Sequence, residues 1–245
     1  MADRMPHIQL PSDLGIEGAI LPGDPARVDR VAAHLEQPEP LVFNREYKSV
    51  RGLYHGTPVL VISTGMGGPS TAIAVEELAR MGVRRMVRIG SCGALSPDLN
   101  IGDLVLVSGA VRDDGTSAGY APVSYPAVAD FDLLGACDRA AAALGAPHTI
   151  GLARSHDCLY GDNNPALYEE WSRRGVIASD METATLFVVG RLRGVRCASI
   201  LNVVAGFHKD VAESVGQYQS GEEATAAGET REILTALGAL DLLNR

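Results

Sequence analysis

The chain has 245 residues and a mass of 25.8 kDa, which suits one α/β domain and predicts a single domain over residues 1–245. Apolar residues make up 46% and charged residues 21%, so a substantial core can form and general disorder is excluded. The formal net charge of −9 argues against nucleic acid or an anionic membrane as the main partner, although a few arginines can still converge on a small anion.

Short apolar runs alternate with helical patterns along the whole chain, with no linker, repeat or charge block. This alternation predicts a mostly parallel sheet covered by helices, with ligands at the carboxyl ends of the strands. The expected strands are 17–21, 58–63, 84–89, 104–110, 150–153, 176–178 and 198–204. The expected helices are 26–35, 70–81, 130–144, 165–174, 183–192 and 225–243. We expect residues 111–128 to form a long loop or hairpin at the rim.

The N-terminal segment lacks the apolar core of a secretion signal, and no apolar run reaches the length of a membrane-spanning helix. The four cysteines show no spacing of the kind that binds a metal. We therefore expect a reduced, cytoplasmic protein of enzyme size, with no metal and no membrane partner.

The first motif with chemical meaning is Pro-Gly-Asp-Pro-Ala-Arg at 22–27, where a strand is expected to turn into a helix. Gly23 allows a backbone N–H to approach an anion, and the helix N-terminus adds a favourable dipole. Arg27, in the first turn, could bind phosphate oxygens. A tight turn with a surface arginine is the alternative, and this short motif leaves both open.

The second motif is the glycine-rich segment Ser-Thr-Gly-Met-Gly-Gly-Pro-Ser at 63–70. It is neither a Walker loop nor a G-x-G-x-x-G turn. The segment indicates either a floor where backbone passes close to a ligand or close packing of a strand against a helix.

The third motif is Arg-Ile-Gly-Ser-Cys-Gly at 88–93, where an arginine stands inside an apolar strand just before an expected turn. A buried arginine is costly unless it is paired. We expect Arg88 to point into a polar site, with Ser91 adding a hydroxyl and an N–H. A buried arginine–carboxylate pair is the less favoured alternative.

The fourth motif places Asp180 and Glu182 on either side of Met181, where a strand meets an apolar helix. A carboxylate in this position can cap the helix N-terminus. It can also accept hydrogen bonds from two sugar hydroxyls, and the spacing does not choose between the two.

These four motifs, in this order, resemble the nucleoside phosphorylase-I family, and within it the uridine phosphorylases. Residues 63–78 contain G-M-G-x-P-S-x-A-I-x-x-x-E-L, the signature of that family, and residues 121–131 resemble the uridine phosphorylase rim. The similarity runs from about His7 to the C-terminal helix. It implies a single-domain, three-layer α/β/α fold with a central mixed, partly barrel-like sheet.

The resemblance also implies the site. The implied phosphate contacts are Gly23, Arg27, Arg88 and Ser91, together with Arg45 donated by the neighbouring subunit. The implied ribose contacts are Met181 and Glu182, together with His7, which reaches the 5′-hydroxyl across a dimer interface. Family members are homohexamers built as trimers of dimers, with the dimer as the smallest complete unit. Some hold a monovalent cation between subunits, and Glu46 and Ser70 are the matching positions.

The implied chemistry is phosphorolysis, with phosphate as co-substrate and no other cofactor. Arginines would fix the phosphate beneath the anomeric carbon of a sugar with oxocarbenium character, so positioning and electrostatics supply the catalysis. Arg88 and Glu182 are the expected catalytic residues. A hydrolase would not need this set of arginines, so it ranks below a phosphorylase.

Base recognition departs from the family pattern. Uridine phosphorylases place a glutamine and an arginine against uracil, whereas the segment 157–165 of this chain is shorter. By counting, Asn163 falls at the glutamine position and Pro165 at the arginine position. Leu159 stands where an aromatic residue is usual. We interpret His156, near the base pocket, as a buried histidine whose hydrogen bonds are satisfied.

The purine branch of the family fits no better. Its members carry an aspartate after the last core strand, where this chain has the apolar stretch 203–206 including Val204. His208, Lys209 and Asp210 follow and could substitute for it. We therefore expect the base contacts to be Leu159, Asn163 and Val204.

A pyrimidine nucleoside phosphorylase, most like uridine phosphorylase, is the first choice. A purine or modified-nucleoside phosphorylase is the runner-up, and a catalytically silent nucleoside-binding homologue is the alternative from another class.

Overall fold

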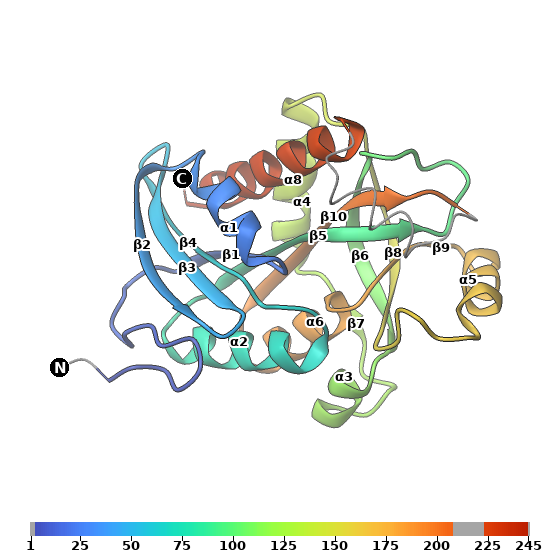
Figure 1. Ribbon diagram of the computed structural model, residues 1–245, viewed down its shortest axis with the longest axis horizontal. Helices are drawn as coiled ribbons and strands as arrows, with labels where there is room; N and C mark the ends of the chain where they lie inside the picture. The colour runs from blue at the N-terminus through green and yellow to red at the C-terminus, as the bar shows by residue number, and fades with distance from the viewer. Residues whose placement is uncertain (1–2, 208–222, 245) are drawn as a thin grey trace.

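The computed structural model describes residues 3–207 and 223–244. Their strands form one mixed sheet, and helices lie on both of its faces (Figure 1). The strands are β1 Gly18–Pro22, β2 Glu36–Asn44, β3 Tyr47–Tyr54, β4 Thr57–Ile62, β5 Arg85–Ala94, β6 Leu104–Asp113, β7 Ala127–Val128, β8 His148–His156, β9 Val176–Asp180 and β10 Arg196–Ala205. The helices are α1 Pro25–Ala32, α2 Gly68–Arg80, α3 Gly115–Tyr120, α4 Phe131–Ala143, α5 Asn164–Arg173, α6 Thr183–Leu192 and α8 Glu223–Leu242.

Five of the strands close into a barrel. The pairing order is β10-β6-β8-β9-β5, and β5 also pairs with β10, which completes the circle. The remaining path β1-β4-β3-β2 extends from β5 as an open wing. The barrel contains parallel pairs, such as β10–β5 and β8–β9, and antiparallel pairs, β10–β6 and β5–β9. The expected mixed, partly barrel-like sheet is thereby confirmed.

The helices complete three layers. Helices α2 and α6 cover one face of the sheet and α1, α4 and α8 cover the other (Figure 1). Each face has its own apolar core: Leu78 and Phe187 belong to one, and Leu133 and Leu237 to the other. Burial of these two faces is the main stabilising contribution. Within the described residues, no helix combines the length and apolar character that crossing a bilayer requires.

The expected turn at 90–93 was wrong, because β5 continues through it to Ala94. Gly90–Gly93 pairs with β10, and Gly93 and Ala94 pair with β9. Barrel closure therefore supplies this backbone with ladder hydrogen bonds on both sides. Glycines that read as a turn in the sequence here allow the strand to bend into the barrel.

The stretch 111–128 is also more regular than expected. Strand β6 continues to Asp113, α3 follows, and β7 pairs back onto β6. Asp114 accepts a hydrogen bond from the N–H of Ser117 at 2.6 Å and so caps α3. The hairpin β2–β3, at 36–54, is an element that the sequence interpretation did not contain. Its outer strand β2 is largely exposed, so it lacks the apolar run that marks a buried strand.

Candidate active site

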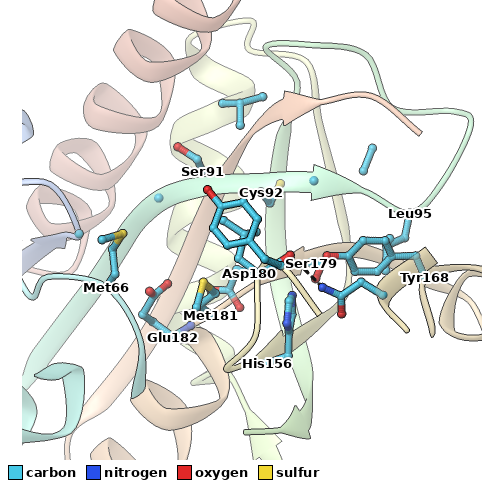
Figure 2. Close-up of a pocket in the computed structure, with 18 of the residues that line it drawn as sticks. Met66, Ser91, Cys92, Leu95, His156, Tyr168, Ser179, Asp180, Met181 and Glu182 are labelled. Atoms are coloured by element: carbon cyan, nitrogen blue, oxygen red, sulfur yellow. Dashed lines mark hydrogen bonds between the residues drawn. The ribbon is translucent and has the colours of Figure 1, made fainter. Parts of the chain in front are cut away.

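A cavity of about 1400 Å³ opens at the carboxyl ends of β1, β4, β5, β8, β9 and β10. Met66, Ser91 and Glu182 lie toward one end of it, and Tyr168 and Leu95 toward the other (Figure 2). We call the first, with Arg27 and Arg88, the arginine end, and the second, with His156 and Ser179, the α5 end. The predicted site residues that line the cavity are Gly23, Arg27, Glu46, Ser70, Arg88, Ser91, Leu159, Met181, Glu182 and Val204. His7, Arg45 and Asn163 do not line it.

Gly23 and Gly65 bring two turns together at the arginine end. The N–H of Gly65 donates to the carbonyl of Gly23 at 3.0 Å. A Cβ on Gly23 would lie 3.2 Å from the Gly65 carbonyl oxygen, so a side chain fits poorly here. Asp24 accepts from the N–H of Ala26 at 2.8 Å and caps α1. The first and second motifs are thus in contact, and both face the cavity.

Arg27 is buried in the first turn of α1 rather than lying on the surface. Its Nε donates to Glu229 at 3.0 Å, its Nη1 lies 3.5 Å from Glu232, and its Nη2 donates to the hydroxyl of Ser91 at 3.3 Å. Both glutamates belong to α8, about 200 residues along the chain. These carboxylates offset the cost of burying the guanidinium beside an open cavity.

Arg88 forms the buried carboxylate pair that was the less favoured alternative, and it also lines the cavity. Its Nε donates to Asp180 at 3.1 Å and its Nη2 to Glu182. Burial acts to lower the pKa of Arg88, but Glu182 and Asp180 outweigh it and raise the pKa. A Cβ on Gly90 would lie 2.6 Å from Nη2 of Arg88. Glycine at 90 is therefore what lets the arginine fold over its own strand.

The fourth motif was expected either to cap a helix or to face a ligand, and its two carboxylates differ in this respect. Asp180 caps α6, because it accepts from the N–H of Thr183 at 3.0 Å and from the hydroxyl of Ser155 at 2.6 Å. Glu182 makes no capping bond and lines the cavity, where it accepts from the N–H of Gly67 at 2.6 Å. Burial raises the pKa of Glu182, while Arg88 acts in the opposite direction.

Glu232 is a second carboxyl at the arginine end whose pKa is raised. It is fully buried behind Arg27 and accepts from the N–H of Gly90 at 3.2 Å. Burial raises its pKa to about 8, with Arg27 opposing the shift and Glu229 adding to it. The charge of the carboxyl behind Arg27 consequently depends on pH near neutrality.

The α5 end carries the polar residues His156, Tyr168 and Ser179, and the acidic Asp162 and Glu169 also line the cavity there. Tyr168 of α5 packs against His156, with ring centroids 6.0 Å apart, and lies 5.7 Å from the guanidinium of Arg154. The Tyr168 hydroxyl interacts with the side chain of Ser179, and burial raises its pKa. Burial lowers the pKa of His156, and Arg154 lowers it further. Both rings are therefore neutral near pH 7.

His156 does not match the satisfied histidine that the sequence suggested. It lines the cavity with only 3% of its surface exposed, and its Nδ1 has no hydrogen-bond partner among the described residues.

The segment 157–165 closes the α5 end through Asn164 rather than Asn163. Asn164 is buried, lines the cavity, and donates to the carbonyls of Cys158 and Leu159 at 2.7 and 2.9 Å. Asn163 is exposed, because it precedes α5 on the outer side of the turn. Pro165 also lines the cavity, and Tyr160 beside it is 81% exposed. His208, Lys209 and Asp210 lie outside the described residues.

His7 and Arg45 lie close to each other on the surface. Asn44 links the two segments by donating to the carbonyl of His7 at 2.7 Å. Glu77 accepts from the N–H groups of His7 and Ile8, and its Oε1 lies 2.7 Å from Nδ1 of the His7 ring. Arg45 sits exposed at the β2–β3 turn with φ of 55°, a left-handed conformation that non-glycine residues seldom adopt.

Glu46 and Ser70 both surround Gly65. A Cβ on Gly65 would lie 2.8 Å from the Glu46 side chain and 3.3 Å from the Ser70 hydroxyl. The pair thus presents a carboxylate and a hydroxyl at the cavity wall. Residues 3–207 and 223–244 contain no cluster of three or more histidine, cysteine, aspartate or glutamate side chains suited to a metal ion.

Sequence reasoning missed the residues that lie far along the chain from the motifs they contact: Glu229, Glu232, Ser155, Tyr168 and the pairing role of Asp180. One signal was available. A buried arginine implies a nearby carboxylate, and each of Arg27 and Arg88 has two. The sequence does not say which carboxylates these are.

Comparisons with known proteins agree on one family. The model of the phosphorylase superfamily matches residues 18–237. Uridine phosphorylase from Treponema pallidum is 42% identical over 209 residues, covering 81% of each chain. Guanosine phosphorylase from Halorubrum lacusprofundi is 41% identical and covers 84% of this chain and 87% of its own. The crystal structure of uridine phosphorylase from Vibrio fischeri superposes with a TM-score of 0.91 at 38% identity, over 99% of this chain and 98% of its own.

Proposed function

Because the chain belongs to the phosphorylase superfamily, we propose that it cleaves the N-glycosidic bond of a nucleoside with inorganic phosphate. The products are a free base and ribose or deoxyribose 1-phosphate, which makes the protein a pentosyltransferase. The observation that carries the proposal is that two guanidinium groups, Arg27 and Arg88, a hydroxyl at Ser91 and the carboxylate of Glu182 line one cavity.

Phosphate would bind at the arginine end. Ser91 already bonds to Nη2 of Arg27, and no described residue accepts from Nη1 of Arg88. Gly23 offers a backbone approach beside the N-terminus of α1, where the helix dipole favours an anion. Arg27 and Arg88 lie close enough that Arg27 acts to lower the pKa of Arg88. An anion between two like charges relieves that repulsion, which favours phosphate at this point.

The ribose would lie over Met181 and Glu182. A carboxylate can accept hydrogen bonds from the 2′- and 3′-hydroxyls, and its negative charge favours the positive charge that develops on the sugar. The electron pair of the breaking C1′–N bond leaves with the base, and a phosphate oxygen forms the new bond to C1′. Because phosphate is itself the nucleophile, the chain needs to supply only position and charge, and no cofactor besides phosphate is required.

We also infer that the active unit is a dimer within a hexamer built as a trimer of dimers. Arg45 and His7 would complete the neighbouring subunit's site, at the phosphate and at the ribose 5′-hydroxyl. Their exposure, the link through Asn44 and the left-handed backbone of Arg45 support this role. Glu46 and Ser70, as oxygen donors, fit a hard monovalent cation at such a boundary. No step of the reaction runs through that cation.

A pyrimidine nucleoside remains the first choice of substrate, and Val204 and Leu159 would line the base. A purine or modified nucleoside is the second, and the similarity to a guanosine phosphorylase favours keeping it. The cellular role would be nucleoside breakdown and salvage in the cytoplasm, with neither nucleic acid nor membrane as a partner.

A panel of nucleosides, each incubated with and without phosphate, tests the proposal. We expect free base and a sugar 1-phosphate to appear only with phosphate, as followed by chromatography. Cleavage at full rate without phosphate would instead identify a hydrolase. Absence of cleavage with every nucleoside would favour the silent nucleoside-binding homologue.

A further inference from the structure

The α5 end of the cavity has an unexplained buried histidine. Strands β8 and β9 are parallel, with Arg154 opposite Ser179 in the register. Side chains alternate along a strand, so His156, two residues after Arg154, faces the same side as Arg154 and Ser179. Figure 2 shows the His156 ring directed into the pocket below Ser179 and beside Met181. The ring is therefore part of the surface against which a ligand at this end would lie.

Neighbours hold this ring firmly on one side. Tyr168 packs edge-on against it, and Tyr168 is in turn placed by Arg154 and Ser179. Arg154 is fixed by Asp113, whose Oδ2 accepts from its Nε at 2.7 Å. Asn164 holds the loop that follows His156 by donating to the carbonyls of Cys158 and Leu159. A ring held this rigidly is preorganised to hydrogen-bond with a ligand bound against it.

The neutral His156 ring can offer a ligand one hydrogen-bond acceptor. Burial and Arg154 lower its pKa, while the Cys158 carbonyl favours a proton on the ring. A neutral imidazole has one N–H and one lone pair. With the proton on the nitrogen nearer the Cys158 carbonyl, the other nitrogen is an acceptor. The Ser179 hydroxyl donates to the carbonyl of Arg154 at 3.4 Å, and the Tyr168 hydroxyl interacts with Ser179.

We propose, resting on the phosphorolysis proposed above, that His156 determines base specificity by accepting a lactam N–H from the base. Uracil offers this N–H at N3, and hypoxanthine or guanine at N1. An exocyclic amino group brings two N–H groups to a single lone pair and would leave one unpaired, so cytosine and adenine fit less well.

The test removes the acceptor by substituting His156 and removes the donor by methylating the lactam N–H of the base. Binding of uracil and 3-methyluracil, and of hypoxanthine and 1-methylhypoxanthine, is measured by calorimetry in saturating phosphate. The proteins are the wild type, H156F, H156A and H156Q. We expect H156F to weaken binding of the lactam base about 10- to 100-fold, and N-methylation to cost the wild type a similar factor. In H156F the methyl group should cost nothing further.

Two further variants, H156Q and the distant control H34Q, distinguish base recognition by His156 from a merely structural role of that residue. The amide oxygen of H156Q can accept the same N–H, so binding should return to within about threefold of the wild type. His34 is exposed beyond the end of α1, and H34Q should bind as the wild type does. If H156F does not fold, as judged by circular dichroism, H156A takes its place in the comparison.

Two results would overturn the assignment of His156: no binding of either lactam base to the wild type, or an equal methylation penalty in the wild type and H156F. The uracil and hypoxanthine arms separate a pyrimidine from a purine site. Calorimetry measures binding of the free base and does not depend on cleavage of a nucleoside. Failure of phosphorolysis would therefore show in the nucleoside panel alone, while the binding data would still decide the role of the histidine.

Discussion

The two ends of the cavity differ in the kind of group that they present to a ligand. At the arginine end, Arg27 and Arg88 are buried and each is compensated by two carboxylates. At the α5 end, His156, Tyr168 and Ser179 are neutral hydrogen-bonding groups beside apolar Leu95. A charged group in a site that excludes most water interacts strongly with a ligand, but its burial must be offset by ions of opposite charge. Neutral polar groups cost less to bury, and they distinguish ligands by the geometry of their hydrogen bonds. Changes at the first end should therefore abolish the reaction, and changes at the second should alter substrate choice.

The largest effect is expected from Arg88→Ala or Glu182→Ala. Each removes one charge from the proposed phosphate–ribose contacts, so kcat/KM should fall about 1000-fold. The assay is phosphate-dependent release of free base, with circular dichroism to confirm that the fold persists. Arg84→Ala, which changes an exposed arginine just before the same strand, is the matched control and should stay active. Normal turnover in either site variant would remove its assigned role.

Arg45→Ala should lower kcat/KM about 100-fold if the neighbouring subunit supplies this arginine to the phosphate. Mixing Arg45→Ala with Arg88→Ala in equal amounts, and letting dimers reassort, should then restore about a quarter of the wild-type activity, because half of the dimers gain one intact site. Turnover is measured before and after reassortment. A mixture no more active than its two components would place Arg45 outside the site.

At the α5 end, Tyr168→Phe should have a smaller and more selective effect. It removes the hydroxyl that interacts with Ser179 but keeps the ring packed on His156. We expect KM for the nucleoside to rise about threefold to tenfold, with KM for phosphate unchanged. Initial rates with each substrate varied in turn provide the measurement. Equal changes in both constants would mean that the two ends are not independent.

The smallest effect concerns stability behind the arginine end. The pKa of Glu232 rises from its usual 4.5 to about 8 in the fold, so the native state binds an extra proton between these values. The stabilisation is complete below pH 4.5 and is lost as pH rises toward 8. Glu232→Gln cannot ionise, so at pH 8 its Tm should gain several degrees on the wild type, relative to the difference at pH 5. Thermal melts at both pH values measure this, and parallel curves would contradict it.

The arginine end was largely predictable because its groups belong to short, continuous motifs. Gly23 and Arg27 lie four residues apart, and Arg88 and Ser91 three apart, so each short segment brings its own polar groups to the cavity. The same local logic predicted α6 at its true bounds. It failed at residues 90–93, where glycines that look like a turn are held in β5 by pairing with β9 and β10.

The α5 end was not predictable in the same way. His156, Tyr168 and Ser179 come from three elements, and each is unremarkable in its own segment. Counting along the loop selected Asn163, whereas the fold turns Asn164 inward. A one-residue difference of this kind depends on how α5 begins, and sequence patterns place helix ends least precisely.

By itself the sequence determined the family and the α/β class and predicted that Arg27, Arg88 and Ser91 share one cavity, because motif spacing and hydrophobic alternation act over a few residues. Only the tertiary structure decided which carboxylates compensate Arg27 and Arg88, and that His156 faces the cavity. Glu229 and Glu232 reach Arg27 from α8, about 200 residues away in the chain. Contacts at that separation follow from closing the barrel and packing helices on it, and no local propensity encodes them.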